Sequence, residues 1–261
     1  MKGAIWQSTF FYGTFWLMKP YPLPDETLDT FLNGTLKVLQ KKKGYRFSID
    51  AILLSQFIHI QKNEKAIDLG TGCGILPLLL SKTTKGRSFI GVEIQKSLAE
   101  CAQRNVTLNR LEDKISILHQ DYRDLRKIFP SGSFDVVFSN PPYRRLRTGR
   151  INPSEEKAIA RHEFNGTIDE LVQVASYLLR QKGRCYLIFS SSRLIDLMVA
   201  LRNSQLEPKR LQLVYPRPNE PSKFVLIESI KVSGVELTIL PPLILHPWTP
   251  SQRPSLKLTW N

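Results

Sequence analysis

The sequence predicts an α/β fold built on a mostly parallel sheet. From about residue 64, short apolar runs alternate with longer segments of helical periodicity, which is the pattern of βαβ units. Near the end of the chain, two strand-like runs are joined by a proline-rich loop that leaves no room for a crossover helix. Two strands joined in this way must pair antiparallel. We therefore expect a parallel sheet that ends in an antiparallel hairpin.

A small cap is predicted before this sheet. Residues 19–27 are rich in proline and acid and predict a lead-in loop. Residues 34–47 first alternate apolar and polar side chains and then reach Lys41-Lys42-Lys43-Gly44, which predicts a β-hairpin with a basic turn at 41–44. Residues 49–60 carry apolar side chains at helical spacing and predict a helix.

The strands of the main sheet follow from short apolar runs, and the helices from apolar side chains at helical spacing. The predicted strands are 66–69, 89–94, 115–120, 134–139, 185–190, 211–215 and 223–232. The predicted helices are 74–81, 96–109 and 168–180. The domain boundaries that follow are an N-terminal extension (1–24), for which disorder and a packed strand are both open, a cap (25–63), the main domain (64–245) and an irregular tail (246–261).

Composition narrows the class of protein and of partner. The chain has 37 Lys+Arg against 23 Asp+Glu, a formal charge of +14, which favours a polyanion such as RNA, although a generally basic protein is the alternative. Cys73, Cys101 and Cys185 are widely spaced and form no Cys-x-x-Cys pair, so the sequence predicts neither a disulfide framework nor a zinc site, and no other metal. A reducing cytoplasm fits this cysteine usage. No apolar run is long enough to span a membrane.

The stretch Asn140-Pro141-Pro142-Tyr143 directly follows the predicted strand 134–139. Two prolines cannot continue a sheet ladder, so the strand must end there, at the edge where open α/β sheets bind ligands. The Asn140 side-chain oxygen and the Pro141 carbonyl offer two acceptors to a planar amino group, and Tyr143 offers a ring to stack on. A plain turn is the alternative.

An acid and three glycines form a loop after the first strand of the main domain. Its candidate binding residues are Asp68, Gly70, Thr71, Gly72, Cys73 and Gly74. Glycine permits positive φ and a close approach of ligand to backbone. A dinucleotide loop would need its third glycine one residue later, and Asp68 would repel a pyrophosphate. The loop instead suits a zwitterionic amino acid, as in S-adenosylmethionine.

Two further acids end the next two predicted strands. Glu93 lies about 20 residues past the loop, where a carboxylate accepts both hydroxyls of a ribose. Asp121, followed by Tyr122, is placed to accept a hydrogen bond from the amino group of an adenine, although a helix cap is the alternative. Together with Asn140, these elements end four successive predicted strands, so we expect them to form one cofactor and acceptor site.

With these motifs the chain resembles the class I S-adenosylmethionine-dependent methyltransferases. The Asn-Pro-Pro-Tyr form resembles the branch that methylates planar amino groups. Residues 44–54, 160–163 and 223–228 further resemble the bacterial tRNA(Val) adenine-N6 methyltransferase group. The resemblance implies a Rossmann-like seven-stranded sheet with an antiparallel final hairpin, S-adenosylmethionine as cofactor, and N6 of an adenine in the tRNA anticodon loop as target.

Basic residues beside the motif are candidate RNA contacts, with solvated surface charge as the alternative. They are Arg144, Arg145, Arg147 and Arg150, and, in the cap, Lys41, Lys42 and Lys43. Two rival functions stay open: a protein-glutamine N5-methyltransferase and a non-enzymatic, cofactor-holding RNA-binding module. The sequence does not determine which RNA or nucleotide is modified, nor whether residues 1–17 are native. It also leaves the oligomeric state open, with a monomer as the default.

Overall fold

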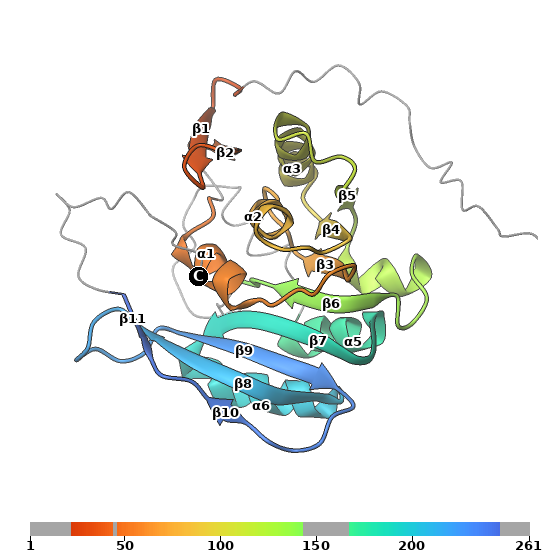
Figure 1. The fold of residues 1–261 in the computed structure, drawn as a ribbon, viewed down its shortest axis with the longest axis vertical. Helices are drawn as coiled ribbons and strands as arrows, with labels where there is room; N and C mark the ends of the chain where they lie inside the picture. The colour runs from red at the N-terminus through yellow and green to blue at the C-terminus, as the bar shows by residue number, and fades with distance from the viewer. Residues whose placement is uncertain (1–21, 44–45, 143–166, 246–261) are drawn as a thin grey trace, which may run out of the picture.

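The computed structural model describes residues 22–43, 46–142 and 167–245, which form one large mixed sheet, its helices and a separate hairpin (Figure 1). The hairpin consists of β1 (Glu26–Phe31) and β2 (Leu36–Lys41). The strands of the large sheet are β3 (Lys65–Leu69), β4 (Ser88–Glu93), β5 (Ile115–His119), β6 (Phe134–Ser139), β7 (Leu179–Ser190), β8 (Leu206–Tyr215), β9 (Phe224–Lys231), β10 (Thr238–Ile239) and β11 (Leu243–Ile244). The helices are α1 (Ile49–Phe57), α2 (Ile75–Thr83), α3 (Lys96–Leu108), α5 (Ile168–Leu178) and α6 (Leu194–Asn203), with 3-10 turns η2 (Tyr122–Lys127) and η3 (Ser191–Arg193).

The large sheet has the strand order β10-β8-β9-β7-β6-β3-β4-β5, and β11 also pairs with β8. Strands β7, β6, β3, β4 and β5 pair in parallel, whereas β9 lies between β7 and β8 and is antiparallel to both. The predicted parallel sheet with an antiparallel hairpin at one end is therefore confirmed. The predicted count of seven strands is too low, because the described residues form a nine-stranded sheet. The two extra strands, β10 and β11, are short and pair in parallel with the edge strand β8.

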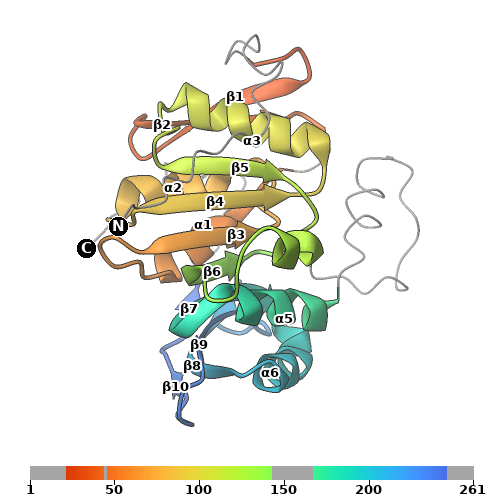
Figure 2. The same cartoon turned by 90° about the vertical axis from the view of Figure 1, so that its right-hand side faces the viewer.

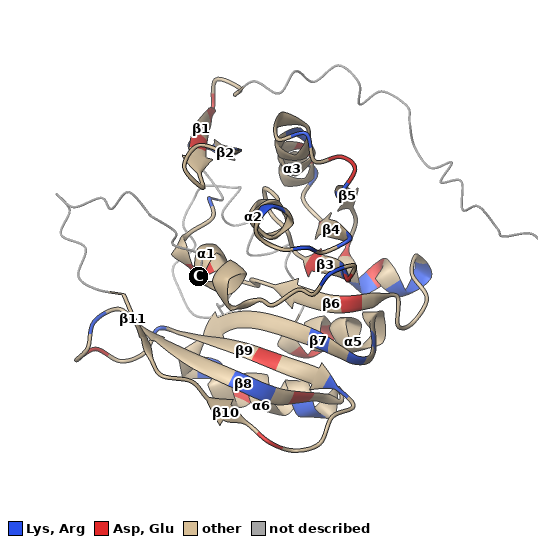
Figure 3. Ribbon diagram, in the orientation of Figure 1, with Lys and Arg blue, Asp and Glu red and all other residues tan. Residues whose placement is uncertain are grey.

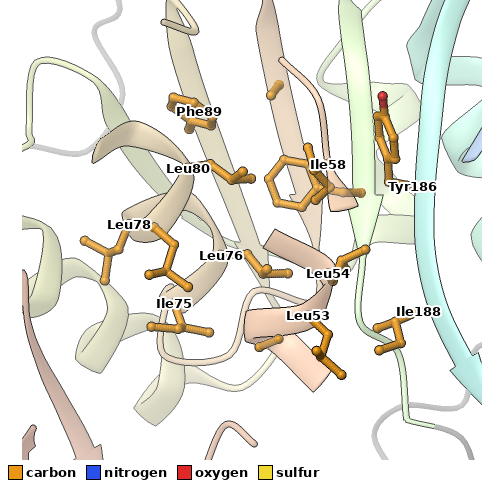
Figure 4. Close-up of a cluster of buried hydrophobic side chains, with 14 of the residues drawn as sticks. Leu53, Leu54, Ile58, Ile75, Leu76, Leu78, Leu80, Phe89, Tyr186 and Ile188 are labelled. Atoms are coloured by element: carbon orange, nitrogen blue, oxygen red, sulfur yellow. The ribbon is translucent and has the colours of Figure 1, made fainter. Parts of the chain in front are cut away.

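Helices cover both faces of this sheet (Figure 2). Along β3 the side chains alternate, so that Ala66 packs with α1, α2 and α3, and Ile67 packs with η2, α5 and α6. Because each central strand is buried on both faces, its sequence is continuously apolar instead of alternating. Figure 4 shows the first of these cores, where leucines and isoleucines of α1 and α2 meet Phe89 of β4 and Tyr186 of β7.

The predicted N-terminal hairpin is present, but its turn lies elsewhere. The chain reverses at 32–35, where Asn33 and Gly34 have φ of 55° and 85° and the Thr35 N–H donates to the Leu32 carbonyl (3.2 Å). Leu32 also has positive φ (50°), and the loop spans four residues between the paired Phe31 and Leu36; Asn and Gly adopt positive φ most readily, so the Asn33-Gly34 pair suits this turn. The expected turn at 41–44 was wrong, because Lys41 pairs with Glu26 at the open end of the hairpin. Residues 26–27 accordingly belong to β1 and not to a lead-in loop.

The sequence placed several boundaries incorrectly, including the start of β8, which lies at Leu206 and not at 211, and it missed one helix. Helix α5 ends at Leu178 and β7 begins at Leu179, six residues before the predicted start at 185. The early part of β7 contains a register shift against β6, between Phe134 and Val136, which hides its strand periodicity. Helix α6 was not predicted. None of the helices in the described ranges has the length and hydropathy of a membrane-spanning segment.

Candidate active site

The ends of four neighbouring strands bring the candidate residues to one edge of the sheet. Asp68 of β3 lies in register with Gly91 of β4 and with Phe138 of β6, and Glu93 of β4 lies in register with His119 of β5. The strands are adjacent in the order β6-β3-β4-β5. Asn140 therefore follows β6, the glycine loop follows β3, Glu93 ends β4, and the start of η2 follows β5. The chain leaves β3 towards β4 on one side and returns to β6 on the other. Such a reversal of strand order is where open α/β sheets bind ligands.

The glycine loop has the backbone conformation that its sequence predicts. Gly70, Gly72 and Gly74 have φ of 81°, 58° and 83°, a region that side chains disfavour. The N–H groups of Gly70 and Thr71 both donate to the Val92 carbonyl at 2.9 Å, which fastens the loop to the end of β4. Gly74 then starts α2. The loop thus turns tightly from strand to helix.

Glu93 holds the same loop with its carboxylate. It is only 2% exposed; its Oε2 accepts the Gly72 N–H (2.8 Å) and its Oε1 accepts the Gln95 N–H (2.9 Å). Burial raises the pKa of Glu93, and these backbone N–H groups oppose that rise. Each carboxylate oxygen has a second acceptor position, so Glu93 is able to bind a ribose while it keeps the loop in place.

Asp68 is a fully buried acid at the base of the loop. Within the described part of the chain, neither of its carboxylate oxygens nor the Thr71 hydroxyl has an aligned hydrogen-bond partner. Burial raises the pKa of Asp68 to about 8; the nearby Thr71 hydroxyl opposes this rise and the Glu93 charge adds to it. A buried acceptor without partners is costly. The arrangement therefore fits a ligand that brings hydrogen-bond donors and positive charge to this carboxyl.

Asp121 is engaged locally in this structure. Its Oδ1 accepts the Arg123 N–H (2.9 Å) and caps η2, and its carboxylate forms an ion pair with the Arg123 guanidinium (2.5 Å). Burial alone raises the pKa of Asp121, but the Arg123 hydrogen bonds outweigh it, so the pKa lies below its ordinary value. Tyr122 beside it is buried, which raises the pKa of its hydroxyl. An adenine amino group would share Asp121 with Arg123, so the adenine role stays a prediction.

Strand β6 ends where the prolines require it to end. Its last residue, Ser139, is fully buried, and the Ser139 hydroxyl donates to the Leu69 carbonyl (2.5 Å), which ties β6 to the start of the glycine loop. Asn140 follows it and is half-buried, Pro141 is buried and Pro142 is exposed. The acceptor candidates thus begin directly beside the glycine loop.

Five of the predicted site residues lie outside the described ranges. Tyr143, Arg144, Arg145, Arg147 and Arg150 fall within 143–166, which the structure does not describe.

The cap lysines lie at the open end of the hairpin and not at its tip. Lys41 forms ion pairs with Asp25 (2.8 Å) and Glu26 (3.5 Å), and Lys42 Nζ donates to the Pro24 carbonyl (2.8 Å). Lys43 is exposed. The RNA role of these lysines stays a prediction, and it is weakest for Lys41 because its charge is already paired.

Sequence reasoning missed three residues that shape the site. Ser139 carries no local signal, since its partner is 70 residues away. Gly91 lies within β4, and a Cβ there would approach Thr71 and Ile117 to 2.9 Å; a lone glycine inside a strand was the available signal for such a close approach. Asn105 on α3 donates to the Cys73 carbonyl of the loop (2.9 Å).

The described cysteines and acids suggest no metal centre. Cys73, Cys101 and Cys185 are buried free thiols. Among the described residues, no group of three or more His, Cys, Asp and Glu side chains is arranged to hold a metal ion.

Known proteins resemble this chain in sequence and in fold. A tRNA1(Val) (adenine(37)-N6)-methyltransferase from Porphyromonas gingivalis is 32% identical over 167 residues, 63% of this chain, and the match spans just under two thirds (65%) of that relative's length. The protein of the same name from Bacteroides fragilis is 27% identical over 190 residues, 73% of this chain and 79% of the relative.

Two solved structures share the fold. A predicted O-methyltransferase from Agrobacterium tumefaciens superposes with a TM-score of 0.61 at 24% identity, over 77% of this chain and 92% of its own. TYW2 from M. jannaschii, in complex with AdoMet, has a TM-score of 0.55 at 16% identity, over 80% of this chain and 87% of its own.

The family model described as the methyltransferase small domain matches residues 48–198. This match includes the glycine loop, Glu93, Asp121 and the Asn-Pro-Pro-Tyr motif, and it confirms the methyltransferase resemblance. Because the match covers more than half of the chain, the protein belongs to the methyltransferase small domain family.

Proposed function

We propose that this protein is an S-adenosylmethionine-dependent N-methyltransferase that acts on the exocyclic amino group of adenine in RNA. We place the target at N6 of an adenine in the tRNA anticodon loop. The observation that carries the proposal is the meeting, at one sheet edge, of a buried carboxyl without aligned partners, Asp68, and the acceptor pair Asn140 and Pro141. The printed names of the two relatives support the adenine and the tRNA.

The residues present fit the cofactor. Asp68 offers its buried carboxyl to the amino acid part, and Gly70, Gly72 and Gly74 leave backbone free of side chains beside it. Glu93 would bind the ribose hydroxyls. Asp121 and Tyr122 would hold the adenine, and Thr71, Cys73 and Asn140 would line the site. The cofactor supplies a methyl group on a positively charged sulfur.

The Asn-Pro-Pro-Tyr motif would prepare the acceptor. The Asn140 side-chain oxygen and the Pro141 carbonyl accept the two N–H groups of the adenine amino group, which localises the nitrogen lone pair and stabilises the positive charge that develops there. Pro142 keeps the backbone stiff, and Tyr143 stacks on the target ring, a contact worth roughly 1–3 kcal/mol. The excess proton leaves to water afterwards, so no side chain has to act as a base.

RNA is the substrate class that the charge favours. The chain has a formal charge of +14, and Arg144, Arg145, Arg147 and Arg150 directly follow the motif. These arginines would hold the phosphates of a loop whose target base is splayed out of its stack. Lys42 and Lys43 are secondary contacts in this proposal. We place the reaction in the cytoplasm and take a monomer as the working state, with the cap at 25–63 and the catalytic domain at 64–245.

A substrate survey tests this proposal. The full chain is incubated with labelled S-adenosylmethionine and, separately, with total tRNA, DNA and release-factor protein, and each product is digested and analysed. We expect label in N6-methyladenosine from tRNA alone. Label in glutamine would instead establish the protein-glutamine N5-methyltransferase alternative, and cofactor binding without any label would favour an RNA-binding module.

A further inference from the structure

Two asparagines, Asn105 of α3 and Asn109 at the C-cap of α3, pair with the outer edge of the cap hairpin. The Asn105 side chain accepts the Leu39 N–H (2.6 Å) and donates to the Leu39 carbonyl (3.0 Å). The Asn109 side chain does the same with Lys37, at 2.9 Å and 2.6 Å. Lys37 and Leu39 are alternate residues of β2, so their backbone groups face the same edge. The two amides, four residues apart on one helix face, therefore replace a third strand of the hairpin, and β2 lies beside α3 (Figure 2).

Other contacts fix the same interface. Arg104 forms a buried two-point ion pair with Glu26 of β1, with N–O distances of 2.9 Å and 2.8 Å. Cys101 Sγ contacts the Leu39 carbonyl at 3.4 Å. A two-stranded hairpin has marginal stability by itself. The hairpin is therefore held in position by this attachment to α3 together with the buried side chains of β2, Leu36, Val38 and Leu39.

Asn105 differs from Asn109 in one respect that matters for the candidate site. Its Nδ2 also donates to the carbonyl of Cys73 in the glycine loop (2.9 Å), whereas the second bond donated by Asn109 Nδ2 goes back to α3, to the Asn105 carbonyl (2.8 Å). Asn105 is fully buried. The next loop residue, Gly74, packs so closely on α3 that a Cβ would lie 3.3 Å from the Cβ of Ala102. The Asn105 amide thus forms hydrogen bonds with the hairpin and with the loop at the same time.

We propose that Asn105 is a positioning residue of the cofactor site, through which the docked cap hairpin sets the conformation of the glycine loop. The inference rests on the proposed function, because it assigns the loop to S-adenosylmethionine. Rotation of the amide towards either partner breaks a bond to the other, so the loop and the hairpin share one geometry. The hairpin consequently influences cofactor affinity through Asn105 and not through its contact with Asn109, although it contributes no residue of its own to the glycine loop.

The test compares the two asparagines. We would measure the Kd of S-adenosylhomocysteine calorimetrically for the full-length wild type, Asn105→Ala, Asn105→Asp and Asn109→Ala, at a temperature where circular dichroism shows each variant folded. Asn105→Asp keeps the acceptor for the Leu39 N–H but loses the donors to the Leu39 and Cys73 carbonyls. We expect both Asn105 variants to bind about tenfold more weakly, equivalent to about 1.4 kcal/mol, and Asn109→Ala to bind like the wild type.

A second readout separates positioning from general stability. Both asparagines support the hairpin, so Tm should fall for variants at either position. Hydrogen exchange of the amides at 70–74 should accelerate only in the Asn105 variants. Unchanged affinity in the Asn105 variants, or an equal loss in Asn109→Ala, would overturn the inference. A wild type that binds no S-adenosylhomocysteine would instead refute the proposed function, which keeps the two failures distinct.

Discussion

Asp68 shows how burial sets the chemistry of a single side chain. A carboxyl group loses its preference for the charged form when water and hydrogen-bond donors are removed. With its pKa raised to about 8, Asp68 is mostly protonated in the free protein at pH 7. A cationic ligand beside it would favour the charged form and lower that pKa.

Cofactor binding should therefore release a proton from Asp68. Because the free protein holds this proton below about pH 8, affinity should rise by up to about tenfold per pH unit as the pH increases from about 6 to 8, and should level off above that range. Calorimetry of S-adenosylmethionine binding in two buffers of different ionisation enthalpy measures the number of protons released on binding. Asp68→Asn is the control and should abolish the dependence; a wild type without proton release would show that Asp68 does not change its protonation state on binding.

Asn140 should matter much more for the chemical step than for cofactor binding. Asn140→Ala removes one of the two acceptors for the amino group, so we expect kcat to fall by about a hundredfold or more. The Kd of S-adenosylhomocysteine should change by less than about threefold, since the glycine loop and Glu93 stay intact. Single-turnover methylation and calorimetry check the two values. An equal loss of both would assign Asn140 to the cofactor or to the fold.

Contacts with the neighbouring strand β4 help to keep the glycine loop in shape. Two loop N–H groups bond the Val92 carbonyl, Glu93 bonds a third, and the Thr71 side chain crosses β4 where Gly91 leaves room. The absence of a side chain at Gly91 is therefore part of the binding site. A lone glycine in the strand provides the space that the loop occupies.

Gly91→Ala should disturb the loop from the side of the strand. The new Cβ would approach Thr71 and Ile117 to 2.9 Å, so the loop has to shift. We expect a loss of about 1–3 kcal/mol in unfolding free energy and weaker cofactor binding. Gly234→Ala is the matched control, because a Cβ at Gly234 meets nothing within 4 Å, and it should change stability by less than about 0.5 kcal/mol. Equal behaviour of both variants in urea unfolding and calorimetry would refute this account.

At the scale of the whole molecule, the proposed RNA substrate makes the distribution of basic side chains a testable feature. Figure 3 shows Lys and Arg spread over several surfaces of the described chain, including the segment between α2 and β4. Lys85 and Arg87 are exposed there, just before β4 begins. They lie at the edge of the sheet opposite to the candidate site, because the site follows the ends of the parallel strands.

The arginines after the motif should bind RNA more strongly than those at the opposite edge. Arg144→Ala with Arg145→Ala should raise KM for tRNA about tenfold and reduce the salt dependence of binding by roughly two charges. Lys85→Ala with Arg87→Ala removes the same charge far from the site and should change KM by less than about twofold. Steady-state kinetics and binding at several salt concentrations check both. Equal effects of the two pairs would mean that net charge, and not position, governs RNA affinity.

Local sequence patterns predicted most of the strands and helices of the fold. The runs at β3, β4, β5 and β6 are short, apolar and followed by motifs, so their strands were predicted to within about a residue or two at each end. The turn of the cap hairpin was predicted incorrectly. The lysines at 41–43 suggested a turn there, whereas the Asn33-Gly34 pair forms it. Strands β10 and β11 left too short a pattern to detect, because two residues pair only where β8 already offers an edge.

The sequence by itself determined the family, the parallel sheet and the position of the candidate residues at successive strand ends, because these follow from spacing along the chain. The tertiary structure decided how those residues are held. Asp68 lacks an aligned partner only because the surrounding fold buries it, and Asp121 is engaged by Arg123. Asn105 meets Cys73 and Leu39 because α3 lies between the loop and the hairpin. Burial and long-range hydrogen bonds depend on packing between distant segments, and no local pattern records them.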